Sequence, residues 1–342
     1  MPKAIKITLW VIGIIIFLIF SAALWLNSQW GQNIIKDKAV IYLGNKLKTE
    51  VRIGYLGVGF PKYIVIRDVL IKDQVKDTLL TLNELKIDLN MLALIHKNLD
   101  VQQVIITGLH GHIYRNMPDT DFNFAYIINA FAGNSPVDTS KKTATTATPL
   151  KFEVEKVRLE NIHLKYDDYT GGIRLGLDLE HLSLKMKNLD LDKMIIHVQD
   201  IKLSGFVSEF NQDSSFLPTK PPKPGKTDVQ IVADNVSIEK VAFKYNDHLN
   251  NLTVVLNLGT LQLKLKKFGL ADNVVDVKKL SVNNTDLALV MGKHSNAVNL
   301  KDTVININSS DGWNVNAGEV QFKGVNFKMD NENATRVSKG ID

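Results

Sequence analysis

Beyond about residue 50, apolar residues recur at every second position over long stretches of the chain. The segment "IRLGLDLEHLSLKMKNLDL", residues 173–191, alternates leucine, isoleucine or methionine with polar residues such as Arg174 and Lys185. Successive side chains of a strand point to opposite faces of a sheet, so this pattern predicts strands with one apolar and one solvated face. Antiparallel sheets tolerate a solvated face, and we therefore expect a mostly β, antiparallel fold.

The strand pattern occurs more than once along the chain. "VRLENIHLKYDD" begins at Val157 and "VSIEKVAFKYND" at Val236, and the two copies align without a gap as far as Leu203 in the first. A third copy, "VQFKGVNFKMDN", opens at Val320. In all three copies the alternation shifts by one position, at "LEN", "IEK" and "FKG", which either a bulge or a tight turn would explain. Because the third copy is unfinished, we expect the chain to be the N-terminal part of a longer repetitive protein.

The apolar face of such a sheet needs a cover, and the sequence after residue 50 predicts only one helix, within residues 120–131. The sheet must therefore pack on another sheet, curl on itself or hold an apolar guest. The two interpretations, a groove and a dry sandwich core, share the same residues. The candidate lining residues are Ile162, Leu164, Ile173, Leu175, Leu177 and Leu179 in one repeat, and Val241, Phe243, Leu252, Val254, Leu256 and Leu258 in the next.

The N-terminal segment predicts a membrane anchor. Ile7–Leu26 is a run of 20 residues without a charge, and at 1.5 Å per residue it spans roughly the 30 Å hydrocarbon core of a bilayer. Lys3 and Lys6 precede the run, so the positive-inside rule leaves the N-terminus in the cytoplasm and the bulk of the chain outside it. Trp10 and Trp25 suit the two interfaces. A cleaved signal peptide ending near "SAA" is the alternative.

The remaining segments complete the predicted organisation. Helical spacing of Trp30, Ile34, Ile41 and Leu47 predicts an amphipathic helix that either caps the first sheet or rests on the bilayer surface. Two polar stretches, one of low complexity and one rich in proline and lysine, predict linkers. The predicted divisions are the cytoplasmic tip and anchor (1–27), the amphipathic helix (28–49), a first β unit with a short helix (50–132), a linker (133–150), a β repeat (151–210), a Pro-rich loop (211–227), a second β repeat (228–300) and the start of an incomplete unit (301–342).

Composition and motifs give no sign of catalysis. The net charge of +5 is small and scattered, which does not favour nucleic-acid binding, and the chain has no cysteine. The sequence contains no GxSxG, P-loop or HExxH motif. His110 and His112 share a strand face but lack an evident third metal ligand. Asp167, Asp168 and Asp247 recur at equivalent strand ends, which indicates turn chemistry. We therefore expect no enzyme, no metal and no cofactor.

Several segments, taken in order, resemble the N-terminal region of AsmA-like proteins, most closely the TamB (translocation and assembly module) branch of gram-negative bacteria. They are "WGQNIIKDKAVIYLGNKLKTEVRIGYLGVGF", "IRDVLIKDQVKDTLLTLNELKIDL", "VQQVIITGLHGHIYR" and "DTDFNFAYIINAF". The resemblance covers roughly residues 1–210. It implies a single-pass inner-membrane protein whose bulk forms a long β-groove, or β-taco, in the periplasm.

The resemblance also implies two functions. The first is shielding of phospholipid acyl chains and their conduction toward the outer membrane in envelope biogenesis. The alternative is a scaffold or chaperone in outer-membrane protein assembly and secretion, acting with an Omp85-type partner. The anchor, the repeated amphipathic strands and the lack of catalytic motifs are compatible with either, so the expected partners are phospholipid, the inner membrane and such an outer-membrane protein, without nucleic acid.

Overall fold

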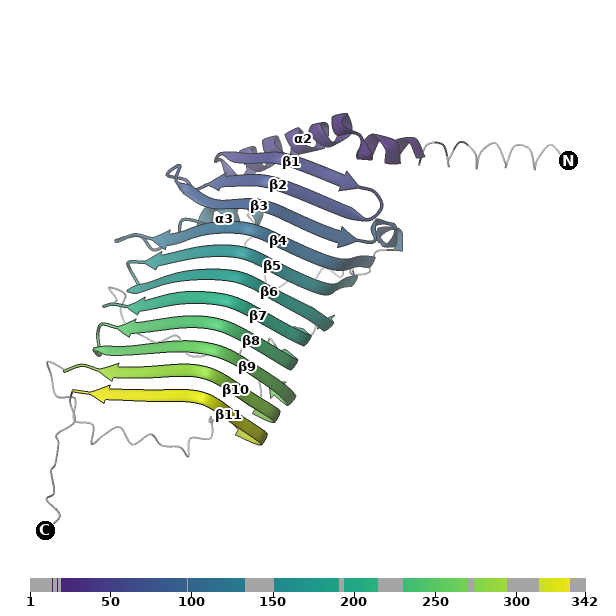
Figure 1. The fold of residues 1–342 in the computed structure, drawn as a ribbon. Helices are drawn as coiled ribbons and strands as arrows, with labels where there is room; N and C mark the ends of the chain where they lie inside the picture. Colours follow the sequence, from purple (N-terminus) through teal and green to yellow (C-terminus); the bar gives the residue numbers. More distant parts are fainter. Residues whose placement is uncertain are drawn as a thin grey trace, which may run out of the picture. The chain divides into compact units, whose positions relative to one another are not determined.

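The computed structural model in Figure 1 describes residues 14, 17, 20–96, 98–132, 151–190, 194–214, 230–269, 274–293 and 314–332. Eleven strands in this part of the chain hydrogen-bond in chain order, from β1 to β11, as one sheet. The mostly β prediction is therefore confirmed. Contacts divide the chain into two compact units: unit 1 comprises Met1–Gly108 and Phe124–Glu155, and unit 2 comprises Leu109–Asn123 and Lys156–Asp342.

Unit 1 is a short antiparallel meander with a helix beside its first strand. Its elements are α2 (Gln29–Leu47), β1 (Val51–Gly59), β2 (Tyr63–Lys72), β3 (Thr78–Leu89), the 3-10 turn η1 (Met91–His96), the first part of β4 (Asn98–Arg115) and α3 (Ala125–Ala132). Ser28 caps α2 by accepting a hydrogen bond from the Gly31 N–H, and Lys48 ends it in the left-handed conformation. α2 packs along β1 and so covers the first strand of the sheet, but Trp30 and Ile41, two of the four residues whose spacing predicted an amphipathic helix, are exposed.

Unit 2 carries the long strands. They are β5 (Lys151–Asp168, of which the part from Lys156 belongs to unit 2), β6 (Ile173–Asp190), β7 (Ile195–Gln212), β8 (Gln230–Asp247), β9 (Leu252–Gly269), β10 (Val274–Met291) and β11 (Asn314–Asn331), each of 18 residues. The strands β5, β6 and β7 are matched one by one by β8, β9 and β10, with the same offset along the chain that separates Val157 from Val236. The sequence repeat is therefore a repeat of three strands, and β11 has the position of a first strand.

The prediction of a wholly antiparallel sheet is wrong at the junctions between repeats. β7 pairs with β8 in parallel, and β10 pairs with β11 in parallel, whereas the pairs within each repeat are antiparallel. The physical reason is the odd number of strands in each repeat. The third strand of a meander runs in the direction of the first, so the next identical repeat can begin beside it only in parallel, after a crossover connection.

Residues with left-handed backbone lie at the middle of five strands of unit 2, and we call them the left-handed line. They are Asn161, Gly205, Lys240, Asn284 and Gly324, with φ between 50° and 66°. The strand registers place Gly205 beside Lys240, and Asn284 beside Gly324. A left-handed residue within a strand interrupts the alternation of side chains, as a bulge does. The shift of parity seen in the sequence is therefore a mid-strand irregularity and not a turn, and we infer that it keeps the apolar side chains before and after it on one face.

Substitutions on the left-handed line are expected to change stability in opposite directions. Gly205→Ala should lower the free energy of unfolding by about 1–2 kcal/mol, because the left-handed conformation is unfavourable for a residue with a Cβ. That Cβ would also collide with Glu180 Oε2. Lys240→Gly should raise stability by up to about 1 kcal/mol, because it relieves the same strain. Urea unfolding followed by circular dichroism measures both, with Gly176→Ala as the control because its added Cβ meets no atom within 4 Å. If Gly205→Ala and Lys240→Gly change the free energy of unfolding in the same direction, the expected backbone strain is contradicted.

Most of the predicted anchor lies outside the described residues, as do Lys3, Lys6 and Trp10. Within the described part, residues 20–27 are helical, and Trp25 packs edge-on against Trp30 with ring centroids 6.2 Å apart. No helix in the described stretches is long and apolar enough to cross a membrane.

Candidate apolar binding face

All twelve predicted lining residues lie on one face of unit 2, which we call the apolar face. Residues directly opposite each other on neighbouring strands point to the same side of a sheet. Ile162 pairs with Leu179, and Leu164 with Leu177; Val241 pairs with Leu258, and Phe243 with Leu256. β7 joins the two groups, because it pairs with both β6 and β8. The apolar face therefore extends from β5 to β9, with Ser208 of β7 as a polar residue in the row of Leu177 and Phe243.

The apolar face is only partly covered. Ile162, Leu179 and Leu258 retain 3%, 7% and 8% of their accessible surface, whereas Leu164 retains 37%. The other eight predicted lining residues are intermediate in exposure. The core of a closed sandwich would bury such rows almost completely. In the described part of unit 2, the apolar face is thus a half-exposed surface.

Sequence reasoning missed the contributions of β7, β10 and β11 to this face. Pairing across the sheet brings side chains of β7 into the rows of β6, side chains of β10 into the rows of β9, and side chains of β11 into the rows of β10. The added residues are Phe206, Phe210, Leu287, Leu289, Phe327 and Met329. Ser208 and Thr285 interrupt the apolar alternation on β7 and β10. This explains why the two strands were not recognised, although the repeat makes them equivalent to each other.

The repeated aspartates at one end of the apolar face close turns, as predicted. Asp168 Oδ1 accepts a hydrogen bond of 2.7 Å from the Gly171 N–H. Asp247 Oδ1 accepts hydrogen bonds of 3.0 Å from the backbone N–H groups of Leu249 and Asn250. Both aspartates are buried. Their recurrence therefore reflects the same hairpin in two repeats.

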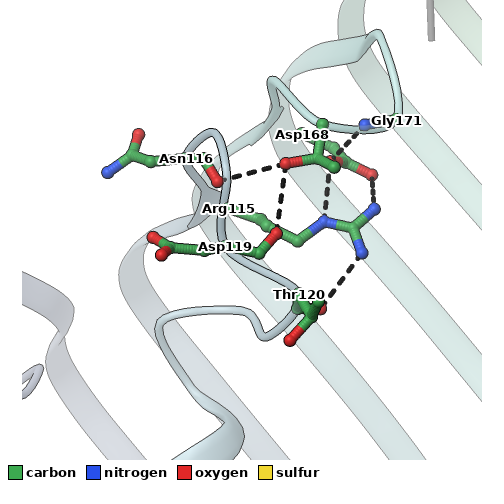
Figure 2. A network of polar contacts seen from close by, with 7 residues as sticks. Arg115, Asn116, Asp119, Thr120, Asp168 and Gly171 are labelled. Atoms are coloured by element: carbon green, nitrogen blue, oxygen red, sulfur yellow. Dashed lines mark hydrogen bonds and ion pairs between the residues drawn. The ribbon is translucent and has the colours of Figure 1, made fainter. Parts of the chain in front are cut away.

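At the first of these turns, Asp168 is also held by Arg115, the last residue of β4 (Figure 2). Arg115 Nε donates to Asp168 Oδ1 over 2.9 Å, and Nη2 donates to Oδ2. Arg115 Nη1 donates to the Thr120 carbonyl oxygen, and Thr170 Oγ1 donates to the carbonyl oxygens of Asn116 and Asp119. We call this the Arg115–Asp168 clasp. It fastens the segment 116–120 to the β5–β6 turn.

The clasp places an aromatic residue against the apolar face. The Arg115 guanidinium carbon lies 4.6 Å from the centroid of the Phe122 ring, and that ring lies 5.5 Å from the ring of Tyr166. Tyr166 pairs with Leu175 and so belongs to the apolar face. One end of the apolar face is therefore covered by a loop that is fixed through a buried ion pair.

The electrostatic environment of the clasp keeps Asp168 ionised. Burial raises the pKa of Asp168, but the hydrogen bonds from Arg115 and from the Gly171 N–H outweigh that effect, so the pKa lies below its ordinary value. The hydrogen bond to Asp168 in turn raises the pKa of Arg115. At the second turn, burial again raises the pKa of Asp247, but hydrogen bonds from the Asn250 side chain and backbone outweigh it and lower the pKa of the carboxyl. Both carboxylates serve as acceptors for fixed donors.

The two histidines considered as metal ligands are engaged with other side chains. His112 Nε2 lies 2.8 Å from Asp167 Oδ2. The ring of His110 stacks on that of His163, with centroids 4.5 Å apart, and His163 Nδ1 lies 2.6 Å from Asp178 Oδ1. His110 and His112 thus belong to two separate polar contacts in unit 2.

β11 presents an exposed edge. It is the last strand of the sheet in the described residues, and each of its residues except Asn331 is exposed. Phe322 and Phe327 retain 63% and 62% of their accessible surface. An exposed strand edge with large apolar side chains can pair with a further strand.

Neither a search of protein-family models nor a search of curated proteins found a match for this chain. The resemblance to AsmA-like and TamB proteins therefore stays a prediction from the residues.

Proposed function

We propose that this protein is anchored in the inner membrane and shields phospholipid acyl chains on the apolar face of unit 2, conducting them across the periplasm toward the outer membrane. The observation that carries the proposal is the extent of this half-exposed, largely apolar face across the five strands from β5 to β9. The anchor is the uncharged run Ile7–Leu26.

An extended apolar face suits lipid conduction for a simple physical reason. Exposing an acyl chain to water costs about 0.8 kcal/mol for each CH₂ group. A tail that moves from one strand to the next along a largely apolar face keeps most of its apolar contacts, so its free energy changes little at each step. No catalyst is required, because the protein only has to replace water along the path.

Photo-crosslinking tests this proposal with the full chain in living cells. A photo-crosslinking amino acid placed at Phe243 or Leu256, which face each other on β8 and β9, should give phospholipid adducts that mass spectrometry identifies. The matched controls are Lys244 and Asn257, the next residues on the same strands, which point to the opposite face and are exposed. These controls should give no lipid adduct.

Two outcomes would contradict lipid conduction. Equal adducts at Phe243 and Lys244 would mean that the label meets bulk membrane and not a lipid on the apolar face. Protein adducts without lipid at Phe243 would favour the other candidate function, a scaffold for outer-membrane protein assembly that acts with an Omp85-type partner. The exposed edge and large apolar side chains of β11 are the observation that favours this second function.

A further inference from the structure

A cavity of about 400 Å³ lies in unit 1, between the start of α2 and the β1–β2 hairpin. Asn27, Gln29 and Gln32 line it on the helix side, and Tyr55, Gly57 and Tyr63 line it on the strand side. Its lining residues are all uncharged, and most carry amide or phenol groups. Such groups both donate and accept hydrogen bonds, so the cavity suits a small polar group that has donors and acceptors of its own.

Two glycines make room for the tyrosine rings of this cavity. A Cβ at Gly57 would lie 2.5 Å from the Tyr55 hydroxyl oxygen, and a Cβ at Gly59 would collide with Cζ of Tyr63. Both rings therefore lie against the backbone of β1, where a side chain would otherwise stand. Gln32 fixes one of them, because its Oε1 accepts a hydrogen bond of 3.3 Å from the Tyr55 hydroxyl.

The two cations that lie near the tyrosine rings of the cavity are each paired with a carboxylate. The Arg67 guanidinium lies 5.3 Å from the Tyr55 ring centroid, and Lys86 Nζ lies 5.8 Å from the Tyr63 ring centroid. Arg67 forms an ion pair with Glu84 at 2.6 Å, and Lys86 forms one with Asp88 at 3.2 Å. A free anion would find no unpaired cation among these residues. A zwitterionic group matches better, because its phosphate accepts hydrogen bonds while its ammonium donates them.

The position of the cavity along the chain links it to a bilayer. The apolar run ends at Leu26, and the lining of the cavity begins at Asn27, the next residue. If that run is the anchor, the cavity lies at the level of the lipid headgroups. We propose that this cavity binds the headgroup of a zwitterionic phospholipid at the membrane surface. The inference rests on the proposed function, because it requires both the anchor and a lipid substrate.

The test uses the absence of cysteine from the chain, which makes a single introduced thiol unique. The full chain carrying Gln29→Cys, labelled with a short diazirine, is reconstituted into vesicles of equal parts phosphatidylethanolamine and phosphatidylglycerol and then irradiated. Asn33→Cys is the control, because Asn33 is exposed one turn further along α2 and does not line the cavity. We expect phosphatidylethanolamine to predominate about tenfold at position 29, the ratio given by a preference of about 1.4 kcal/mol, and no preference at position 33.

A second pair of variants tests the cavity itself. Gly57→Ala should displace the Tyr55 ring and reduce the position-29 adduct several-fold, whereas Gly176→Ala, whose Cβ meets no atom within 4 Å, should leave it unchanged. Gln32→Ala should reduce the adduct as well, because it removes the acceptor that fixes Tyr55, and it leaves β1 intact. If neither Gly57→Ala nor Gln32→Ala reduces the amount of lipid adduct at position 29, the proposal is overturned.

The remaining outcomes separate this inference from the proposed function. Equal capture of the two lipids at position 29 would overturn the assignment to a zwitterionic headgroup. Lipid adducts at Phe243 without any at position 29 would overturn the headgroup site and leave the apolar face standing as the lipid path. Lipid adducts at neither place would overturn both.

Discussion

Leu256→Asp is expected to reduce phospholipid crosslinking at Phe243 by about tenfold or more, which corresponds to at least about 1.4 kcal/mol of lost affinity, while the protein stays folded. Leu256 pairs directly with Phe243, so the carboxylate would stand in the row that a lipid tail must contact. Because this residue is half-exposed, the charge can remain hydrated in the free protein. It can do so less readily beneath an acyl chain.

The matched control for this experiment is Asn257→Asp, which places the same charge one residue away on the opposite, exposed face. It should leave crosslinking unchanged and lower stability by at most about 1 kcal/mol, because Asp286 on β10 lies directly opposite Asn257. A different result is expected if the apolar face is the core of a closed sandwich. An unpaired charge in a dry core costs several kcal/mol, so Leu256→Asp would then unfold the protein, and a collapse of its thermal transition would contradict the open face.

Arg115→Ala is expected to produce the largest loss of stability, about 3–5 kcal/mol at pH 7, because it leaves the buried Asp168 carboxylate without its cation. The half-exposed ion pair of Arg174 with Asp213, at 2.8 Å, is the control, and Arg174→Ala should cost at most about 1 kcal/mol. The double variant Arg115→Ala/Asp168→Asn removes the unpaired charge and should be more stable than Arg115→Ala alone. Urea unfolding followed by circular dichroism measures all three.

The effect of Arg115→Ala should depend on pH in a defined direction. In the wild-type protein the folded-state pKa of Asp168 is depressed, so the stability it contributes is present above the unfolded pKa of about 3.9 and is lost as the pH falls through the lower folded value. Without Arg115, burial raises that pKa, and protonation relieves the unpaired charge. The difference in the free energy of unfolding between wild type and Arg115→Ala should therefore be large at pH 7 and become smaller toward pH 4. A gap independent of pH would mean that Arg115 acts through packing alone.

The sequence predicts the strands of unit 2 where the alternation of apolar and polar residues is regular, as in β6 and β9, but not β7 and β10, where Ser208 and Thr285 interrupt it. Alternation along a strand as long as β6 is a strong signal, and the repeat gives that signal a second time in β9. The direction of a strand cannot be predicted in this way, because the alternation of β8 is the same whether β7 runs parallel or antiparallel to it. The parallel junctions follow only from the number of strands in each repeat, which is three. The aligned segment ends within β7 and so did not reveal this number.

The sequence predicted only those residues of the candidate site that lie in regular alternation along a strand. The twelve lining residues stand in uninterrupted alternation, whereas Phe206 and Phe210 flank Ser208, and Thr285 precedes Leu287. The clasp could not be foreseen, because Arg115 and Asp168 are far apart in the sequence and each belongs to an ordinary polar strand end. The left-handed line was visible as a shift in parity, but the backbone conformation that explains it requires φ angles, which residue types such as lysine do not specify.

The three-strand repeat has a consequence for the reach of this molecule. Neighbouring strands are about 4.8 Å apart, so each added repeat of three strands lengthens the apolar face by roughly 14 Å. Each added repeat also begins with a strand of the same direction. Length therefore changes in steps of one whole repeat. Natural variation or engineering that inserts or removes one such block would change the distance covered without altering the cross-section of the path.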